Sequence, residues 1–276
     1  MFKNYGVIGI LLVILVELNF FFKIQPFANF YFPIVWFGYI LIVDALVYKL
    51  KGSSLISNRF RYFLGMLIIS VIVWWLFELI NISINNWNYI SSSKMSDIAS
   101  IIMRILAYST VIPAFFDTVE LVRCIHLFDK KKLHKKHKIT KMFLHVMIFL
   151  GFLSFFVPIF IPAFTFPLVW LSFFFILDPI NYLHNQPSII KHIKDRKLVI
   201  PLSLLLAGII LGFLWEFWNY WAVRKWVYNI PFVGFFKIFE MPLLGYLGYF
   251  PFAFELYVMY WFVRSLFVNK ESLLVD

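Results

Sequence analysis

Residues 198–222 read LVIPLSLLLAGIILGFLWEFWNYWA, an apolar run that nevertheless contains Glu216 and Asn219. A helix needs about 20 mostly apolar residues to cross the hydrocarbon core of a bilayer. Runs of this kind recur along the whole chain, with no long polar segment between them. The sequence therefore predicts about eight transmembrane helices, at roughly 6–23, 31–48, 62–82, 98–126, 142–161, 164–183, 198–222 and 236–264, the fourth and eighth being long and broken by proline.

The composition excludes a soluble fold. Of 276 residues, 62% are hydrophobic and 14% are charged, whereas soluble domains are about half apolar and a quarter charged. The first span carries Glu17 and Asn19 and is not followed by a small-residue cleavage site, so we interpret it as a retained helix and not a signal peptide. The expected fold class is an all-α integral membrane protein.

The net charge of +11 is explained by membrane topology and not by nucleic acid. Lys and Arg gather in alternate loops, above all in KKKLHKKHK at 130–138, and cytoplasmic loops of membrane proteins carry such an excess. This pattern predicts a multi-pass cell-membrane protein with both termini in the cytoplasm. The single Cys124 and the lack of a Cys/His ligand pattern predict no metal and no cofactor.

The chain also repeats itself, because residues 30–125 match residues 164–263 at nearly constant spacing. The matches include Asp, Glu, Asn and Pro, which are scarce in this chain, and self-similarity of this kind indicates duplication. The sequence predicts two parallel four-helix repeats, 1–128 and 142–276, joined by a basic linker at 129–141; a homo-oligomer is left open. The matched pairs are Phe30/Phe164, Pro33/Pro167, Trp36/Trp170, Asp44/Asp178, Tyr48/Tyr182, Glu78/Glu216, Asn81/Asn219, Trp87/Trp226, Tyr89/Tyr228, Tyr108/Tyr246, Pro113/Pro251 and Asp117/Glu255.

Four acidic residues within the spans are the candidate catalytic residues. Placing a carboxylate in hydrocarbon costs at least about 2.5–3.5 kcal/mol, so such residues face the bundle interior or a wet cavity. Glu78 and Glu216 each share a helical face with an asparagine three residues later, while Asp117 and Glu255 each follow a proline by one helical turn. The alternative is that they only form hydrogen bonds between helices. For Asp44 and Asp178, near the cytoplasmic ends of their spans, a structural role is favoured.

Polar and aromatic residues near these acids are candidates for substrate binding. The pair Trp-x-Tyr follows each glutamate at similar spacing, and aromatic faces can stabilise a cation. Arg104 has no basic counterpart in the second repeat; it could pair with Asp117 or Glu120, or extend to the interface. The predicted substrate contacts are Asn81, Asn219, Trp87, Tyr89, Trp226, Tyr228, Arg104 and Tyr246.

These residue types favour acid-initiated chemistry on an apolar lipid. A carboxylic acid kept neutral by its surroundings can donate a proton to an isoprenoid double bond. The carbocation that results could be stabilised by aromatic faces until a second carboxylate removes a proton.

W-E-F-W-N at 215–219, W-V-Y at 226–228 and P-F-A-F-E at 251–255 resemble the small membrane lycopene cyclases. Intramembrane acids without an aspartate-rich diphosphate motif also resemble the fungal-type membrane terpene cyclases. The lycopene-type pattern has an aspartate directly before asparagine and a double acid after proline, which this chain lacks. The resemblance implies cyclisation or isomerisation of a carotenoid or terpenoid lipid.

Two other classes fit the same pattern. Parallel repeats with symmetric intramembrane carboxylates also describe proton- or cation-coupled transporters and channels. A non-catalytic scaffold, in which the acids hold helices together, is the third interpretation. A cyclase needs an unlike acid and base, and the pairs Asp117/Glu255 and Arg104/Pro242 favour unlike halves.

Overall fold

The computed structural model describes residues 1–267 of the chain, which are mostly helical. Seven segments of this part are long and apolar enough to cross a membrane, so the chain is a multi-pass membrane protein of the predicted helical class. The first seven predicted spans agree with them to within a few residues. The seven segments are Asn4–Phe22, Tyr31–Lys51, Phe60–Ile84, Asp97–Cys124, Lys141–Phe160, Pro162–Leu183 and Val199–Trp221.

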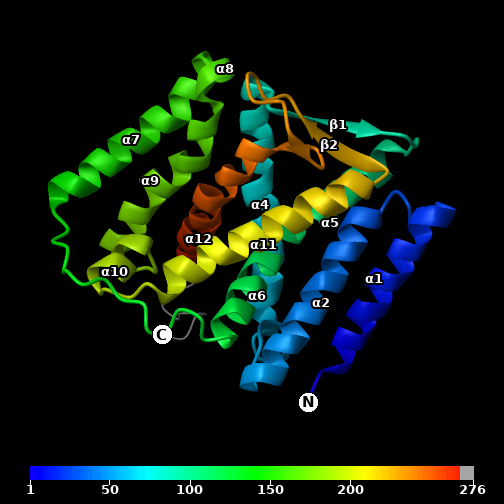
Figure 1. The fold of residues 1–276 in the computed structure, drawn as a ribbon, viewed down its shortest axis with the longest axis horizontal. Coiled ribbons are helices and arrows are strands. Elements are labelled where there is room, and N and C mark those ends of the chain that lie inside the picture. Colours follow the sequence, from blue (N-terminus) through cyan, green and yellow to red (C-terminus); the bar gives the residue numbers. More distant parts are fainter. Residues whose placement is uncertain (268–276) are drawn as a thin grey trace.

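The elements follow one another in a similar order before and after the basic linker (Figure 1). Before it come α1 (Asn4–Phe22), α2 (Tyr31–Lys51), α3 (Leu55–Asn58), α4 (Phe60–Ile84), β1 (Trp87–Ser91), α5 (Asp97–Ser109) and α6 (Val111–Cys124). After it come α7 (Lys141–Phe160), α8 (Pro162–Thr165), η1 (Phe166–Leu168), α9 (Val169–Leu183), α10 (Ile189–Lys194), α11 (Val199–Trp221), β2 (Arg224–Tyr228), β3 (Lys237–Ile238), β4 (Met241–Pro242), η2 (Leu243–Gly248) and α12 (Tyr249–Ser265).

Two helix pairs lie on opposite sides of a central group of helices. The pair α1 and α2 forms one side and the pair α7 and α9 the other (Figure 1). Between them, α6 packs against α2, α4 and α11, and α12 packs against α9, α11 and α4. The chain begins at the end of the molecule opposite the strands β1 and β2, and the basic linker between α6 and α7 also lies there.

The predicted span 98–126 is broken at Thr110, between α5 and α6. Pro113 has no backbone N–H to donate to the carbonyl of Ser109, so α5 ends at that residue. Ser70 of α4 spans the break: its hydroxyl donates to the Tyr108 carbonyl and accepts a hydrogen bond of 3.0 Å from the Ile112 N–H. A side chain of a neighbouring helix thus bonds the Tyr108 carbonyl and the Ile112 N–H, which would pair with each other in a continuous helix.

The predicted span 236–264 is an α-helix only in its second part, α12, and this boundary is a correction. Its first part forms β3, β4 and the 3₁₀ segment η2. Pro242 cannot donate a backbone hydrogen bond, and Gly245 and Gly248 are poor helix formers. A backbone with these residues is held more easily in short turns than in a long α-helix.

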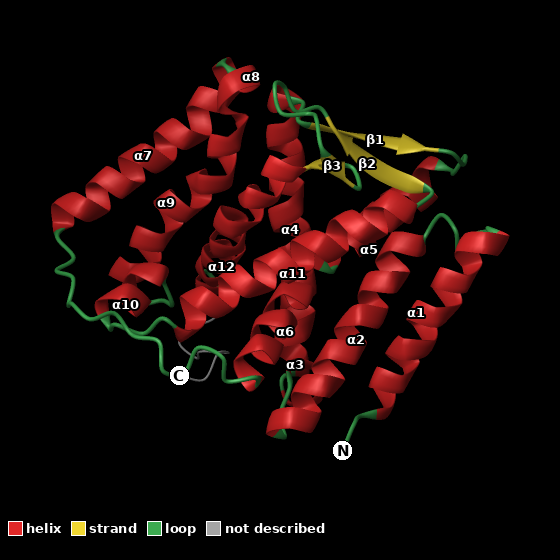
Figure 2. Ribbon diagram, in the orientation of Figure 1, coloured by secondary structure: helices red, strands yellow, loops and turns green. Residues whose placement is uncertain are grey.

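The strands β1 and β2 were not predicted (Figure 2). They follow α4 and α11 and pair with each other antiparallel, joining parts of the chain that are far apart in sequence. The register brings the two Trp-x-Tyr motifs together in reverse order, so that each tryptophan lies opposite the other motif's tyrosine. The paired residues are Trp87 with Tyr228, Asn88 with Val227, and Tyr89 with Trp226.

Candidate functional site

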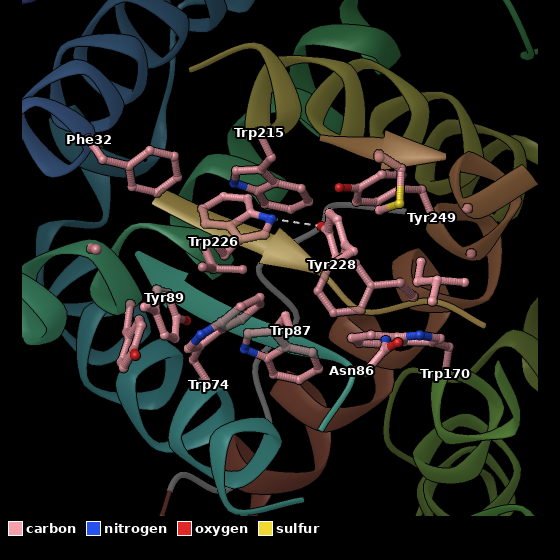
Figure 3. A pocket seen from close by; sticks show the side chains of 18 of the residues that line it. Phe32, Trp74, Asn86, Trp87, Tyr89, Trp170, Trp215, Trp226, Tyr228 and Tyr249 are labelled. Carbon is pink, nitrogen blue, oxygen red and sulfur yellow. Dashed lines mark hydrogen bonds between the residues drawn. The ribbon is translucent and has the colours of Figure 1, made fainter. Parts of the chain in front are cut away.

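A cavity of about 500 Å³ lies beside the paired strands, between α4, α5, α11 and α12 (Figure 3). Its volume falls within the range of roughly 300–1,000 Å³ that is usual for small-molecule sites. Aromatic side chains from both halves of the chain make up a large part of its lining, including Trp74 of α4, Trp170 of α9, Trp215 of α11 and Phe252 of α12. The lining suits an apolar ligand.

The four aromatic residues of the two Trp-x-Tyr motifs all line this cavity. Alternate residues of a strand point to the same face, and directly paired residues of neighbouring strands share a face. Trp87, Tyr89, Trp226 and Tyr228 therefore form one aromatic surface (Figure 3). The sequence predicted these residues near the substrate, but not the strand pairing that brings them together.

Behind this surface lies Glu78, whose carboxylate is held by three side chains, here called the Glu78 cluster. Its Oε1 accepts hydrogen bonds from the indole N–H of Trp74 at 3.1 Å, the indole N–H of Trp87 at 3.2 Å and the Tyr89 hydroxyl at 2.6 Å. An indole N–H can only donate. Two of the three donors therefore cannot accept a hydrogen bond or a proton from Glu78.

Glu216 is completely buried and forms the Glu216 cluster with two tyrosines. Its Oε1 contacts the hydroxyls of Tyr228 at 2.6 Å and Tyr249 at 2.7 Å, while Oε2 has no hydrogen-bond partner within residues 1–267. The indole N–H of Trp226 donates to the Tyr228 hydroxyl at 2.8 Å (Figure 3). Tyr228 and Tyr249 line the cavity and Glu216 does not. Hydrogen bonds with the two tyrosine hydroxyls therefore connect Glu216 to the cavity.

The two tyrosines of the Glu216 cluster differ in whether their hydroxyl hydrogen bonds can change direction. The Tyr228 oxygen accepts from Trp226, so its proton is directed to Glu216. Burial, followed by the negative charge of Glu216, raises the pKa of Tyr228 well above its ordinary value, because both disfavour the phenolate. Tyr249 contacts Glu216 at 2.7 Å and also interacts with the Tyr228 hydroxyl, and a hydroxyl can donate or accept. Tyr249 can therefore reverse its hydrogen bond.

Close helix packing places Tyr249 over the glutamate. A side chain on Gly212 of α11 would meet the ring of Tyr249 at 2.4 Å, and one on Gly208 would meet Ala253 of α12 at 2.8 Å. Small residues let membrane helices approach closely, and Gly212 lies one helical turn before Glu216. The glycines of α11 therefore set the distance between Tyr249 and the carboxylate.

Asn81 and Asn219 hold the strands and do not line the cavity. The Asn81 amide accepts from the backbone N–H groups of Asn86 and Trp87 and donates to the Trp87 carbonyl. The Asn219 amide accepts from the N–H of Trp226 and donates to its carbonyl. Both asparagines contact the backbone at the start of a strand, and their predicted contact with a substrate stays a prediction.

Asp117 and Glu255 are buried away from the cavity. Glu255 accepts a hydrogen bond of 2.9 Å from the backbone N–H of Phe173, near the start of α9. One oxygen of each carboxylate, Asp117 Oδ2 and Glu255 Oε2, has no hydrogen-bond partner in the described part of the chain. The structure does not bring this pair together with the Glu78 and Glu216 clusters.

Asp44 and Asp178 have the structural role that the sequence favoured. Asp178 accepts from the backbone N–H groups of Ile189 at 2.6 Å and Ile190 at 2.9 Å. Asp44 accepts from the N–H of Ile56 at 2.9 Å and from the Ser54 hydroxyl at 2.7 Å. Each carboxylate thus fixes the N-terminus of a short helix, α10 or α3.

Of the two remaining predicted substrate contacts, one lines the cavity in the structure and the other does not. Arg104 lines the cavity, whereas Tyr246 does not and donates to the Ile238 carbonyl at 3.2 Å. It is Tyr249, three residues later, that reaches Glu216. The 3₁₀ geometry of η2 and the close approach of α12 decide this, and neither can be derived from residue spacing.

Two further charged residues were missed. Arg224 lines the cavity, two residues before Trp226 on the same face of β2. Glu17 of α1 accepts hydrogen bonds from the Tyr31 hydroxyl at 3.0 Å and from the indole N–H of Trp218 at 3.1 Å. The alternation of β2 would have signalled Arg224, whereas Glu17 has no acidic counterpart in the second half and gave no repeat signal.

Within residues 1–267, no group of three or more His, Cys, Asp or Glu side chains is placed to hold a metal ion. Comparison with known protein families, curated proteins and solved structures finds no match for this chain. Function is therefore inferred from the chemistry of the site and not from a relative.

Proposed function

We propose that the chain is an intramembrane enzyme that isomerises or cyclises an isoprenoid lipid by acid–base chemistry. The observation that carries this proposal is the convergence of two glutamates on one aromatic cavity. Trp87 contacts Glu78, Tyr228 contacts Glu216, and these two aromatic residues are direct partners in the β1–β2 pairing. Two proton-transfer groups on one apolar site are what a carbocation reaction without net redox change requires.

The two clusters suit different roles. The Oε1 of Glu216 is contacted by two hydroxyls, so when Glu216 is protonated it can donate to the Tyr249 oxygen while Tyr249 passes its own proton to a substrate double bond. Glu78 is held in place by two indole N–H groups, which donate to its Oε1. It can receive the Tyr89 proton while the Tyr89 oxygen takes a proton from the substrate. We assign Glu216 as the acid and Glu78 as the base.

The reaction balances in atoms and electrons. Protonation of one carbon–carbon double bond leaves a carbocation, which a second double bond of the same chain attacks with its π electrons to form the ring bond. Loss of a neighbouring proton to Tyr89 and Glu78 restores a double bond, so the product is an isomer of the substrate. The indole faces of Trp87, Trp170 and Trp215 line the cavity and can stabilise the cation by about 0.5–2 kcal/mol each.

Duplication of a four-helix unit explains why two such clusters exist. We infer two parallel repeats, related by an axis along the membrane normal, with both termini and the basic linker in the cytoplasm. The reciprocal pairing of the Trp-x-Tyr motifs supports this relation. The resemblance of residues 215–219, 226–228 and 251–255 to membrane lycopene cyclases agrees with the reaction class. Glu255 and Asp117, which lie outside the cavity, are left without a catalytic role.

The test is product formation in cells that accumulate linear isoprenoids. Extracted lipids would be compared by chromatography and mass spectrometry between cells expressing the wild-type chain, Glu216→Gln and Glu120→Gln. Glu120 is a matched control, because it forms ion pairs with Lys51 and Arg123 away from the cavity. We expect a new isomer of unchanged mass with the wild type and Glu120→Gln and none with Glu216→Gln. An unchanged lipid profile with all three would contradict the proposal and favour a transporter, to be examined by ion flux in liposomes.

A further inference from the structure

The aromatic cavity has a basic part that acid–base chemistry on a hydrocarbon does not require. Arg104 of α5 and Arg224 of β2 both line it, together with Ser91 and Ser100. The rest of the lining is dominated by aromatic and aliphatic side chains. A ligand that fills such a cavity has an apolar portion and a polar portion of definite charge.

The two arginines lie close together. Ser100 and Arg104 are four residues apart on α5 and so occupy neighbouring positions on one face of that helix. Arg224, the first residue of β2, donates from Nη2 to the Ser100 hydroxyl at 3.2 Å. Tyr108 continues the same face one turn further and also lines the cavity. Both guanidinium groups are therefore directed to one part of the cavity wall.

Neither arginine forms an ion pair with a carboxylate among residues 1–267. The four ion pairs of this part are Lys51–Glu120, Arg123–Glu120, His126–Asp129 and Lys225–Glu240. Lys225 follows Arg224 on the opposite face of β2, where it binds Glu240. The Nε of Arg104 is buried and has no hydrogen-bond partner in the described residues. A buried guanidinium N–H without an acceptor is unfavourable, which an anionic ligand would relieve.

We propose that Arg104 and Arg224 bind the anionic head group of a lipid whose isoprenoid chain occupies the aromatic part of the cavity. The inference deepens the proposed function and rests on it, because it narrows the substrate class from a neutral hydrocarbon to an amphipathic isoprenoid. The forked guanidinium group matches both phosphate and carboxylate with paired hydrogen bonds.

An anchored head group also fixes the orientation of the substrate in the cavity. The residue equivalent to Arg104 in the second half is Pro242, so only the α5 side of the cavity carries this pair of charges. A chain held there by its head group can enter the cavity in one orientation. The same end of the substrate is then always presented to the same cluster.

The test is direct binding, measured by native mass spectrometry with the full chain in nanodiscs of neutral lipid. The probes are farnesyl phosphate, farnesoic acid and farnesol, which share one chain and differ in head group. The variants are Arg104→Gln and Arg224→Gln, with Arg61→Gln as a control, because Arg61 is exposed at the start of α4. The wild type and the control should prefer an anionic probe over farnesol, and the more tightly bound anion identifies the head group.

We expect each cavity substitution to reduce that preference about ten-fold, the effect of losing one charge-assisted hydrogen bond. Affinity for farnesol should stay within about two-fold in all proteins, which shows that the cavity variants are folded. Equal binding of the three probes by the wild type would overturn the head-group site while keeping the isoprenoid cavity. Failure to bind any probe would contradict the isoprenoid proposal itself.

Discussion

Two glutamates occupy equivalent places near the ends of α4 and α11, yet their surroundings differ. Glu78 is half-buried and is contacted by two indole N–H groups and one hydroxyl. Glu216 is completely buried, and its Oε1 is contacted by two tyrosine hydroxyls. Because hydroxyls can reverse their hydrogen bonds and indole N–H groups cannot, this difference is the basis of the acid and base roles that we propose for the two glutamates.

The residues that hold the framework have stayed alike. Each half uses an aspartate to fix a short helix, Asp44 for α3 and Asp178 for α10. Each half also uses an asparagine, Asn81 or Asn219, to hold the first residues of a strand. The two halves differ instead in the side chains that contact the two glutamates and in the segment after each strand, which is α5 in one half and β3, β4 and η2 in the other.

The largest effect is expected from Tyr249→Phe, because it removes the hydroxyl through which Glu216 reaches the cavity. We expect the rate of isomer formation to fall about 10²–10⁴-fold, the usual contribution of general acid catalysis. Tyr228→Phe should have a smaller effect, since the Tyr228 hydroxyl already accepts from Trp226 and is not free to reverse. Initial rates in isolated membranes measure both. Equal losses would show that the acid does not act through Tyr249.

A smaller and different effect is expected from Tyr89→Phe in the Glu78 cluster. Glu78 keeps its two indole contacts in this variant, so the carboxylate stays in place but loses its link to the cavity. Protonation by Glu216 still occurs, and the carbocation then loses protons from other carbons. We expect turnover to fall about ten- to a hundred-fold, with new double-bond isomers detected by chromatography. A lower rate with an unchanged product pattern would exclude Glu78 as the base.

The sequence predicted the helices from long apolar runs. It predicted the pairing of the glutamates from acidic and amide residues, which are scarce in the spans of this chain. Seven long apolar runs match seven candidate spans. Glu78/Asn81 and Glu216/Asn219 stood out because such residues are expensive in hydrocarbon. The same reasoning could not assign roles to the asparagines, since a side chain that serves the backbone and one that serves a ligand leave the same signal in sequence.

The strands and the second tyrosine could not be predicted in this way. β1 and β2 are short, and their stability depends on pairing between segments from different halves of the chain. Tyr249 rather than Tyr246 reaches Glu216 because η2 winds as a 3₁₀ helix and Gly212 admits the ring. Both outcomes depend on tertiary contacts, which residue spacing does not record.

The smallest effect is expected at the caps of the two short helices, where the halves are most alike. Ser54 and Ser188 accept hydrogen bonds from the backbone N–H groups of Ser57 and Lys191. Replacing such a cap by alanine lowers the free energy of unfolding by about 1 kcal/mol. Ser54 also donates to Asp44, so Ser54→Ala should be more destabilising than Ser188→Ala.

Thermal unfolding in one detergent compares the two variants with Ser83→Ala, whose serine is exposed on α4. We expect Ser188→Ala to unfold at a lower temperature than this control and Ser54→Ala at a lower temperature still, with product formation retained in both. A stability equal to that of Ser83→Ala would show that these caps do not contribute. Loss of product formation in a folded Ser188→Ala variant would mean instead that framework and chemistry are coupled, because α10 lies at the opposite end of the molecule from the strands β1 and β2 (Figure 1).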